Sequence, residues 1–202
     1  MGVKITEQIL LTRSPHTMKP LNHRHRISSI TWSVSLKAEI FSIGTELLMG
    51  ELTDTNAAWI AGRLPPLGIQ LQWVSIIGDN LDMLAEAFEK GMERSDIIFT
   101  TGGLGPTHDD ITKAAFCQLL NDEFIFDKNY YSQLKERFDK RLVKMPESNR
   151  SQAMLLKKAD SIPNNTGSAL GLHILEKNTH IFILPGVPGE MKEMVSKYII
   201  PN

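Results

Sequence analysis

The residues best suited to chemistry surround a glycine-rich loop in the middle of the chain. Glycines let backbone N–H groups approach an anion with no side chain in the way, and a helix that follows them adds a partial positive charge. The loop is therefore a candidate phosphate cradle, although it has neither the Gly-Lys-Ser/Thr of a Walker A motif nor a complete dinucleotide fingerprint. It runs Thr101-Gly102-Gly103-Leu104-Gly105-Pro106-Thr107 and continues into His108, Asp109 and Asp110.

Carboxylates directly behind a phosphate cradle would repel a bare phosphate. A divalent ion removes the conflict, because magnesium-type ions bridge one or two carboxylates and the phosphate oxygens of a substrate. Asp109 and Asp110 thus predict a metal site, with Asp79 as a further ligand. Two alternatives stay open: the acids serve only the dipole of the helix behind them, and Lys113 either holds phosphate or pairs with these acids.

Three more loops with unusual residues follow predicted strands. Each alone is explained as a sharp turn, because glycine and proline favour turns everywhere. In an open α/β sheet, however, ligands bind outside the carboxyl ends of the strands. We therefore expect all four loops to share one edge of a sheet and one site. The three are Gly44-Thr45-Glu46, Gly78-Asp79 and Pro185-Gly186-Val187-Pro188-Gly189-Glu190.

The elements that must position these loops alternate along the chain from residue 37. Hydrophobic alternation or short apolar runs predict strands, and apolar residues three or four apart predict helices. This order favours an α/β fold with three layers and a mostly parallel sheet. Strands are expected at 37–43, 69–77, 96–100, 123–126, 171–175 and 180–184, and helices at 57–64, 81–92, 109–120, 128–142, 149–157 and 188–198.

Composition narrows the class of protein. The 202 residues are 42% hydrophobic and 22% charged, and no apolar run approaches the roughly 20 residues that span a bilayer. The net charge of -1 gives no reason to expect nucleic acid or a membrane as a partner. The single cysteine, Cys117, excludes an intramolecular disulfide and suits a reducing cytoplasm. We expect Cys117, His173 and His180 to be structural.

Residues 1–36 differ from the rest, because they hold five Lys or Arg and one acid, Glu7. A basic arm, a transit-like peptide and a translated stretch upstream of the native start all fit this composition. The ordered pattern begins abruptly at Lys37, which favours the third interpretation. The expected organisation is an extension over 1–36 and one domain over 37–202.

From Lys37 to about Met194 the motifs resemble the amino-terminal domain of the competence/damage-inducible protein A (CinA) family. That domain shares its fold with molybdopterin-binding proteins and molybdopterin adenylyltransferases. The Leu-Gly-Pro-Thr ending of the glycine loop is typical of CinA, whereas a shorter Thr-Gly-Gly-Thr-Gly loop is usual in the adenylyltransferases. The matching pieces are Gly44 to Leu48, Thr55-Asn56, Gly78 to Asn80, Thr101 to Thr107, Asp109-Asp110, Thr112-Lys113, Asn149, Gln152-Ala153, Pro163-Asn164, Gly167, Ala169, Gly171, Leu184 to Pro188 and Glu190-Met191.

The resemblance implies a metal-dependent ADP-ribose pyrophosphatase that releases AMP and ribose 5-phosphate. It implies a divalent cofactor (magnesium, manganese or cobalt), potassium as a further candidate ion, a small nucleotide as substrate and a homodimer. We expect backbone N–H groups of Gly102, Gly103 and Gly105 to seat the pyrophosphate. Lys113 and Thr107 would offset charge on the leaving phosphate. The remaining candidate contacts to substrate are Gly44, Thr45, Glu46, Asn56, Thr101, Pro185, Gly186 and Glu190.

Two other functions stay open. One is molybdopterin binding or adenylyl transfer in molybdenum cofactor synthesis, which also uses an anion cradle and a divalent ion. The other is a truncated domain that binds nucleotide without turning it over. Family members usually continue into a further subdomain, and many into a nicotinamide-mononucleotide amidohydrolase domain. The sequence ends at Asn202, before both, so amidohydrolase activity is not assigned.

Overall fold

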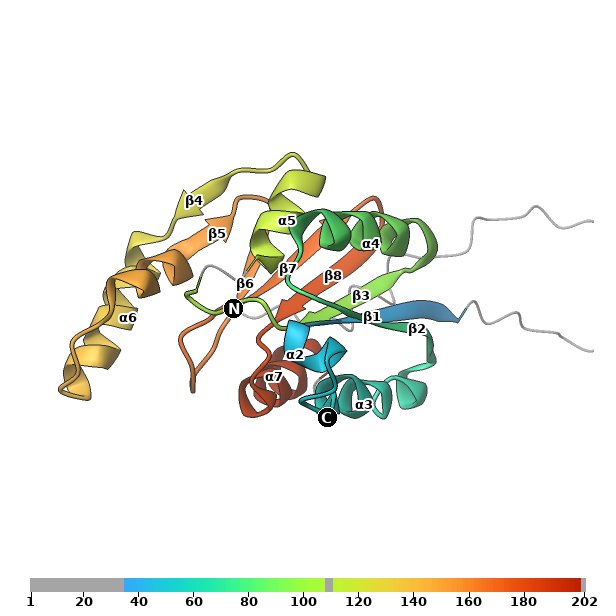
Figure 1. Ribbon diagram of the computed structural model, residues 1–202, viewed down its shortest axis with the longest axis horizontal. Coiled ribbons are helices and arrows are strands. Elements are labelled where there is room, and N and C mark those ends of the chain that lie inside the picture. The colour runs from blue at the N-terminus through green and yellow to red at the C-terminus, as the bar shows by residue number, and fades with distance from the viewer. Residues whose placement is uncertain (1–34, 108–110, 201–202) are drawn as a thin grey trace, which may run out of the picture.

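A six-stranded sheet forms the centre of the computed structural model, which describes residues 35–107 and 111–200 (Figure 1). The first four strands in spatial order run parallel, and the fifth and sixth each pair antiparallel with the strand before them. This arrangement confirms the predicted α/β class with a mostly parallel sheet. In spatial order the strands are β2 (Ile69–Ile77), β1 (Leu36–Ile43), β3 (Ile97–Thr101), β8 (Thr179–Leu184), β7 (Gly171–Glu176) and β6 (Asp160–Ile162).

Helices cover both faces of this sheet. One face carries α4 (Leu81–Arg94) and α5 (Thr112–Leu119), and the other carries α3 (Thr55–Ala61) and α7 (Pro188–Met194) (Figure 1). Every residue of β3 is buried, as expected for a strand that is covered on both sides. α4 begins as predicted, because the side chain of Asn80 accepts a hydrogen bond from the N–H of Met83 (3.0 Å).

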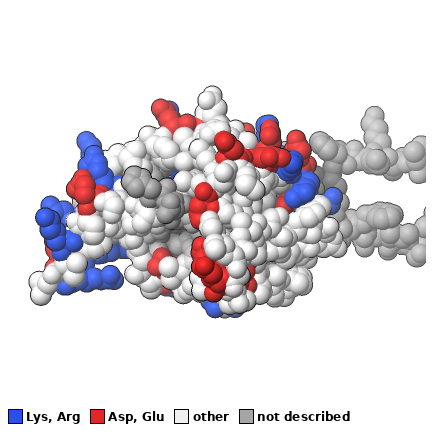
Figure 2. Space-filling view, viewed as in Figure 1, with Lys and Arg blue, Asp and Glu red and all other residues white. Residues whose placement is uncertain are grey.

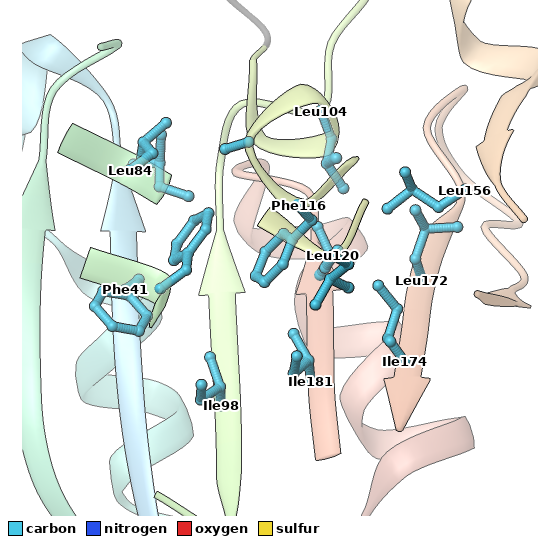
Figure 3. Close-up of a cluster of buried hydrophobic side chains, with 14 of the residues drawn as sticks. Phe41, Leu84, Ile98, Leu104, Phe116, Leu120, Leu156, Leu172, Ile174 and Ile181 are labelled. Atoms are coloured by element: carbon cyan, nitrogen blue, oxygen red, sulfur yellow. The ribbon is translucent and has the colours of Figure 1, made fainter. Parts of the chain in front are cut away.

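Aromatic packing joins α4 and α5 to the sheet (Figure 3). The rings of Phe88 and Phe116 stack with centroids 4.1 Å apart, and Phe41 from β1 meets Phe88 edge-on at 5.2 Å. A Cβ atom at Gly91 would lie 2.8 Å from the Phe41 ring, so this position of α4 must be glycine for the helix to approach. These contacts hold α4 and α5 over β1, the strand that leads into the predicted loop Gly44-Thr45-Glu46.

An arm extends from one end of the sheet (Figure 1). It consists of an antiparallel pair, β4 (Phe124–Phe126) and β5 (Met154–Leu156), with α6 (Lys128–Lys140) and the 3₁₀ helix η2 (Glu147–Ala153). The helix predicted over 149–157 is therefore wrong. Its second half pairs with β4 instead, since Phe124 and Leu156 face each other across that ladder.

Several boundaries also differ from the predictions. α5 begins at Thr112, later than the predicted start at Asp109, and Ile111 precedes its first turn. The helix over 57–64 ends at Ala61 and is followed by a 3₁₀ turn, η1 (Pro65–Leu67). Two short elements were not predicted, β6 and α2 (Thr45–Leu48). The last helix continues beyond α7 as a π-helix, η3 (Val195–Ile199).

Two predictions concern residues that the structure leaves aside. The extension over 1–36 lies outside the described residues except for its last two positions. His108, Asp109 and Asp110 lie outside them as well. Within the described ranges, no helix combines the length and apolar character needed to cross a membrane.

A buried histidine pair stabilises the antiparallel side of the sheet. His173 Nε2 and His180 Nδ1 lie 3.0 Å apart, and the His173 ring stacks on Phe182 with centroids 4.9 Å apart. Burial, reinforced by the neighbouring His180 ring, lowers the pKa of His173 to about 4, and burial also lowers the pKa of His180. Both histidines are thus neutral parts of the core, as expected from the sequence.

This pair predicts a loss of stability in acid. A histidine with a lowered pKa binds fewer protons when folded than when unfolded, so its stabilisation is complete above pH 6.5 and decreases as the pH falls toward 4. For His173 the free energy of unfolding should fall by about 3 kcal/mol over that window. Urea unfolding at several pH values should show this slope in the wild type and a shallower one in His173→Leu. Equal slopes would contradict the prediction.

Candidate functional site

A cleft of about 750 Å³ lies at the edge where the parallel strands end. Loops that follow β1, β2, β3 and β8 line it, which confirms the expected convergence of the four loops on one edge. Thr45, Thr107 and Lys113 are not among its described lining residues, and Asp109 and Asp110 fall outside the described ranges. The predicted residues that do line it are Gly44, Glu46, Asn56, Asp79, Thr101, Gly102, Gly103, Gly105, Pro185, Gly186 and Glu190.

Gly102 is the point where three strands meet. Its φ of 105° is unfavourable for other residues, and a Cβ there would lie 2.1 Å from the carbonyl oxygen of Ile43. Its N–H donates to the carbonyl of Leu184 (3.1 Å), and its own carbonyl accepts from the Thr112 hydroxyl (2.9 Å). This amide is therefore not the phosphate donor that the sequence predicted. Among the predicted N–H donors of this loop, those of Gly103 and Gly105 remain candidates.

Thr45 and Asp79 connect the ends of β1 and β2. The backbone N–H and the hydroxyl of Thr45 both donate to Asp79 Oδ2, at 3.0 and 2.8 Å. The N–H of Asp79 donates in return to the Thr45 hydroxyl (3.2 Å). Thr45 thus orients a carboxylate that lines the cleft, instead of lining the cleft itself.

Asn56 and Asp54 hold the start of α3 beside the cleft. Asp54 caps the helix through Oδ1, which accepts from the N–H of Ala57 (3.0 Å), while Oδ2 accepts from the Ser42 hydroxyl (2.5 Å). Asn56 Nδ2 donates to the carbonyl of Gly186 (2.8 Å). Helix α3 is therefore tied both to β1 and to the loop after β8.

Glu190 lines the cleft from α7, and sequence reasoning missed its partner. Asn164 Nδ2 donates to Glu190 Oε2 (2.6 Å) and to the carbonyl of Ala169 (2.8 Å). A Cβ at Gly167 would lie 2.1 Å from Glu190 Oε2, so this carboxylate packs directly on the glycine. The sequence signal for this partner was the match of Asn164 and Gly167 to family motifs. Neither residue was assigned a role from the sequence.

The arm holds the loop that carries these residues. Arg137 Nη1 on α6 donates to the carbonyls of Asn164 (2.9 Å) and Gly167 (3.2 Å). The Tyr130 hydroxyl donates to the carbonyl of Ser168 (2.8 Å), and burial raises the pKa of this phenol. Ser168 lines the cleft, so one wall of the site depends on α6.

The cleft is acidic. Among the described residues that line it, the charged ones are Glu46, Asp54, Asp79 and Glu190, and none is lysine, arginine or histidine. Figure 2 shows Asp and Glu near the centre of this face, whereas Lys and Arg gather over α6. In the described part of the chain, no group of three or more His, Cys, Asp or Glu residues has the arrangement of a metal site.

Lys113 serves the framework in this structure. Its Nζ donates to the carbonyls of Ser151 and Met154, both at 3.0 Å, and so joins α5 to η2 and β5. Neither the predicted phosphate contact nor the predicted pairing with Asp109 and Asp110 accounts for these two hydrogen bonds.

Comparison with known proteins identifies the fold and the family. The family model described as "Probable molybdopterin binding domain" matches residues 39–202. The structure of the protein CinA from Thermoplasma acidophilum is 30% identical, with a TM-score of 0.74, and the match covers 80% of this chain and 95% of that one. The chain belongs to the CinA family.

Curated relatives support this assignment. A CinA-like protein of Dictyoglomus thermophilum is 38% identical, and a relative from Clostridium beijerinckii that carries the name competence-damage inducible protein is 42% identical. Each match covers 82% of this chain and 40% of the relative, so the chain spans about two fifths of their length. The molybdopterin biosynthesis enzyme MoaB of Thermus thermophilus shares the fold, at 21% identity and a TM-score of 0.52 over 79% of this chain and 87% of that one.

The glycine loop of this CinA domain can be tested by substitution. Gly102→Ala should lower the free energy of unfolding by at least about 3 kcal/mol, because its Cβ would meet the backbone of Ile43. Gly50→Ala is the matched control, since its φ of 73° is also positive but its Cβ would meet nothing within 4 Å. The control should lose only about 1 kcal/mol. Equal losses in urea unfolding would show that Gly102 is not sterically confined.

Proposed function

We propose that this domain is a metal-dependent hydrolase of nucleotide pyrophosphates, with ADP-ribose as its substrate and AMP and ribose 5-phosphate as products. The observation that carries the proposal is the acidic cleft of about 750 Å³, which combines a glycine loop with oriented carboxylates at the carboxyl edge of the sheet. The family resemblance narrows the substrate to ADP-ribose.

The charge of the cleft requires a cation. Two like charges 4 Å apart repel by about 4 kcal/mol at an effective dielectric constant of 20. Four carboxylates without a basic side chain among the described lining residues would therefore exclude a pyrophosphate unless a divalent ion screened them. Carboxylate oxygens suit a hard ion such as magnesium or manganese, and cobalt and potassium stay in the proposal as further candidate ions.

Asp79 is the best supported metal ligand. Its Oδ2 is held by two hydrogen bonds from Thr45, so the carboxylate has a fixed orientation at the cleft. Magnesium is commonly held by one or two protein carboxylates together with substrate phosphates, so a cluster of three protein ligands is not required. Asp109 and Asp110 remain proposed ligands, next to the glycine loop in the sequence.

A bound ion would polarise the attacking water and neutralise the phosphate oxygens. The chain's own residues would bind and orient the substrate. Backbone N–H groups after Gly102 face the phosphates, and Glu46 and Glu190 orient water or a ribose hydroxyl. Lys113 acts indirectly by positioning α5 against η2. Thr107 stays a proposed contact of the leaving phosphate.

A second candidate function is molybdopterin binding or adenylyl transfer to molybdopterin. It is favoured by the description of the matching family, and an anion cradle with a divalent ion would serve it equally well. A third is nucleotide binding without turnover. Tight binding of molybdopterin with no ADP-ribose turnover would favour the second function, and nucleotide binding without turnover under any metal would favour the third.

The proposal predicts metal-dependent release of AMP from ADP-ribose. Asp79→Asn should lower kcat by roughly 10- to 100-fold, because it weakens a metal ligand, and should raise the magnesium concentration needed for half-maximal rate. The control is Glu89→Gln, which removes an exposed carboxylate of α4 outside the cleft and should leave the rate unchanged.

The double variant Asp109→Asn/Asp110→Asn tests the loop acids in the same assay. Loss of metal-dependent turnover in a protein that still unfolds cooperatively is the expected result. Full turnover in both this variant and Asp79→Asn would remove all three residues from the metal site and contradict the proposed chemistry.

A further inference from the structure

Asn56 contains an oxygen that the folded chain leaves without a partner. The residue is only 7% exposed, and its Oδ1 is buried without a hydrogen-bond partner among the described residues. A buried acceptor in that state costs free energy, so most buried acceptors are paired. Thr100 Oγ1 is the other such atom in the described ranges, but Thr100 does not line the cleft, and Asn56 does.

The orientation of the Asn56 amide is fixed. Nδ2 donates to the carbonyl of Gly186 (2.8 Å), and the flipped amide would set two acceptor oxygens against each other. Asp54 also holds the start of α3, through its contacts with Ala57 and Ser42. Rotation of the amide therefore cannot place Nδ2, a donor, where Oδ1 now lies. Whatever the second hydrogen of Nδ2 contacts, the oxygen can be satisfied only by a hydrogen-bond donor or by a cation.

This requirement excludes phosphate as the partner of Oδ1. Phosphate oxygens in a nucleotide at neutral pH accept hydrogen bonds, whereas hydroxyl and amino groups donate them. The expectation that Asn56 contacts phosphate is therefore revised for this atom. A nucleotide group that contacts this oxygen directly must be a hydroxyl or an amine.

The position of Asn56 favours a hydroxyl next to the phosphates. Gly186, which accepts from Asn56, packs against the glycine loop, because a Cβ at Gly186 would lie 3.3 Å from the Cα of Gly102. The Asn56 amide is thus separated from the proposed phosphate seat by a single residue. In a nucleotide, the ribose is attached directly to the phosphate, and the base lies farther away.

We propose that Asn56 Oδ1 accepts a hydrogen bond from a ribose hydroxyl of the bound nucleotide and makes this cleft selective for ribose over deoxyribose. The proposal rests on the proposed function, since it concerns the substrate of that same cleft. It assigns Asn56 to recognition of the sugar, with Gly186 as the residue that orients it. ADP-ribose carries two riboses, and both share this chemistry.

Binding of small analogues distinguishes the two sugars. Calorimetry with magnesium would compare AMP with 2′-deoxy-AMP and 3′-deoxy-AMP, and ribose 5-phosphate with 2-deoxyribose 5-phosphate. In the wild type, one pair should show about tenfold weaker binding of the deoxy compound. Weaker binding of a deoxy-AMP would place the ribose of the AMP half at Asn56. Weaker binding of 2-deoxyribose 5-phosphate would place the ribose of the ribose 5-phosphate half there.

A variant links that discrimination to Asn56. Asn56→Ala should bind the hydroxyl and deoxy compounds with equal affinity, whereas the control Asn129→Ala, an exposed amide on α6, should keep the tenfold ratio. Equal binding of both compounds of each pair by the wild type would overturn the proposal, and this comparison does not depend on the variant folding.

Inosine monophosphate tests the competing donor, because it lacks the amine of the adenine base. Weaker binding of this nucleotide, with full affinity for the deoxy compounds, would assign the oxygen to the base and overturn the ribose proposal alone. An unchanged ratio in Asn56→Ala would also overturn it alone. A wild type that binds neither AMP nor ribose 5-phosphate and does not hydrolyse ADP-ribose would overturn the proposed function as well.

Discussion

The close approach of Gly102 to the carbonyl of Ile43 sets the geometry on which the cleft depends. β1 and β3 can end side by side only because no side chain separates these two backbones. The same glycine is bonded to Leu184 at the end of β8 and lies against Gly186 in the following loop. Three strand ends are therefore brought together before any ligand is considered, and the residues after them face a common space.

The cations beside this space serve the framework. Lys113 follows the glycine loop but binds carbonyls of η2 and β5, and Arg137 binds carbonyls of the loop that holds Glu190. If the cleft binds phosphate as proposed, positive charge is not supplied by a lysine, arginine or histidine among its described lining residues, so backbone dipoles and a bound ion are the proposed sources. In such a site the affinity for nucleotide would be coupled to the affinity for metal. The positive ion would neutralise the phosphates, and the phosphates would neutralise the ion.

Local sequence signals predicted what depends on neighbours along the chain. The bounds of β2 and the first residue of α4 follow from periodicity and helix-start signals. The shared edge of the four loops follows from the parallel direction of their strands. These features were sufficient to locate the cleft but not to assign the contacts within it.

The contacts that were missed join residues far apart in the sequence. The N–H of Gly102 donates to the carbonyl of Leu184, and Lys113 Nζ donates to the carbonyl of Met154. No local sequence pattern encodes either pairing. The strand at Met154–Leu156 forms because β4 offers an edge, although its residues also fit a helical pattern. The unpaired oxygen of Asn56 could not be predicted either, because its orientation depends on a hydrogen bond to Gly186, 130 residues away.

In Figure 1 the arm projects from one end of the sheet, as a separate appendage would. Its hydrogen bonds contradict that impression, since Arg137 and Tyr130 fasten the loop from Asn164 to Ser168, and that loop forms a wall of the cleft. The arm therefore holds this wall in place. A substitution in α6 that removes either contact would therefore loosen this wall without replacing any residue that lines the cleft.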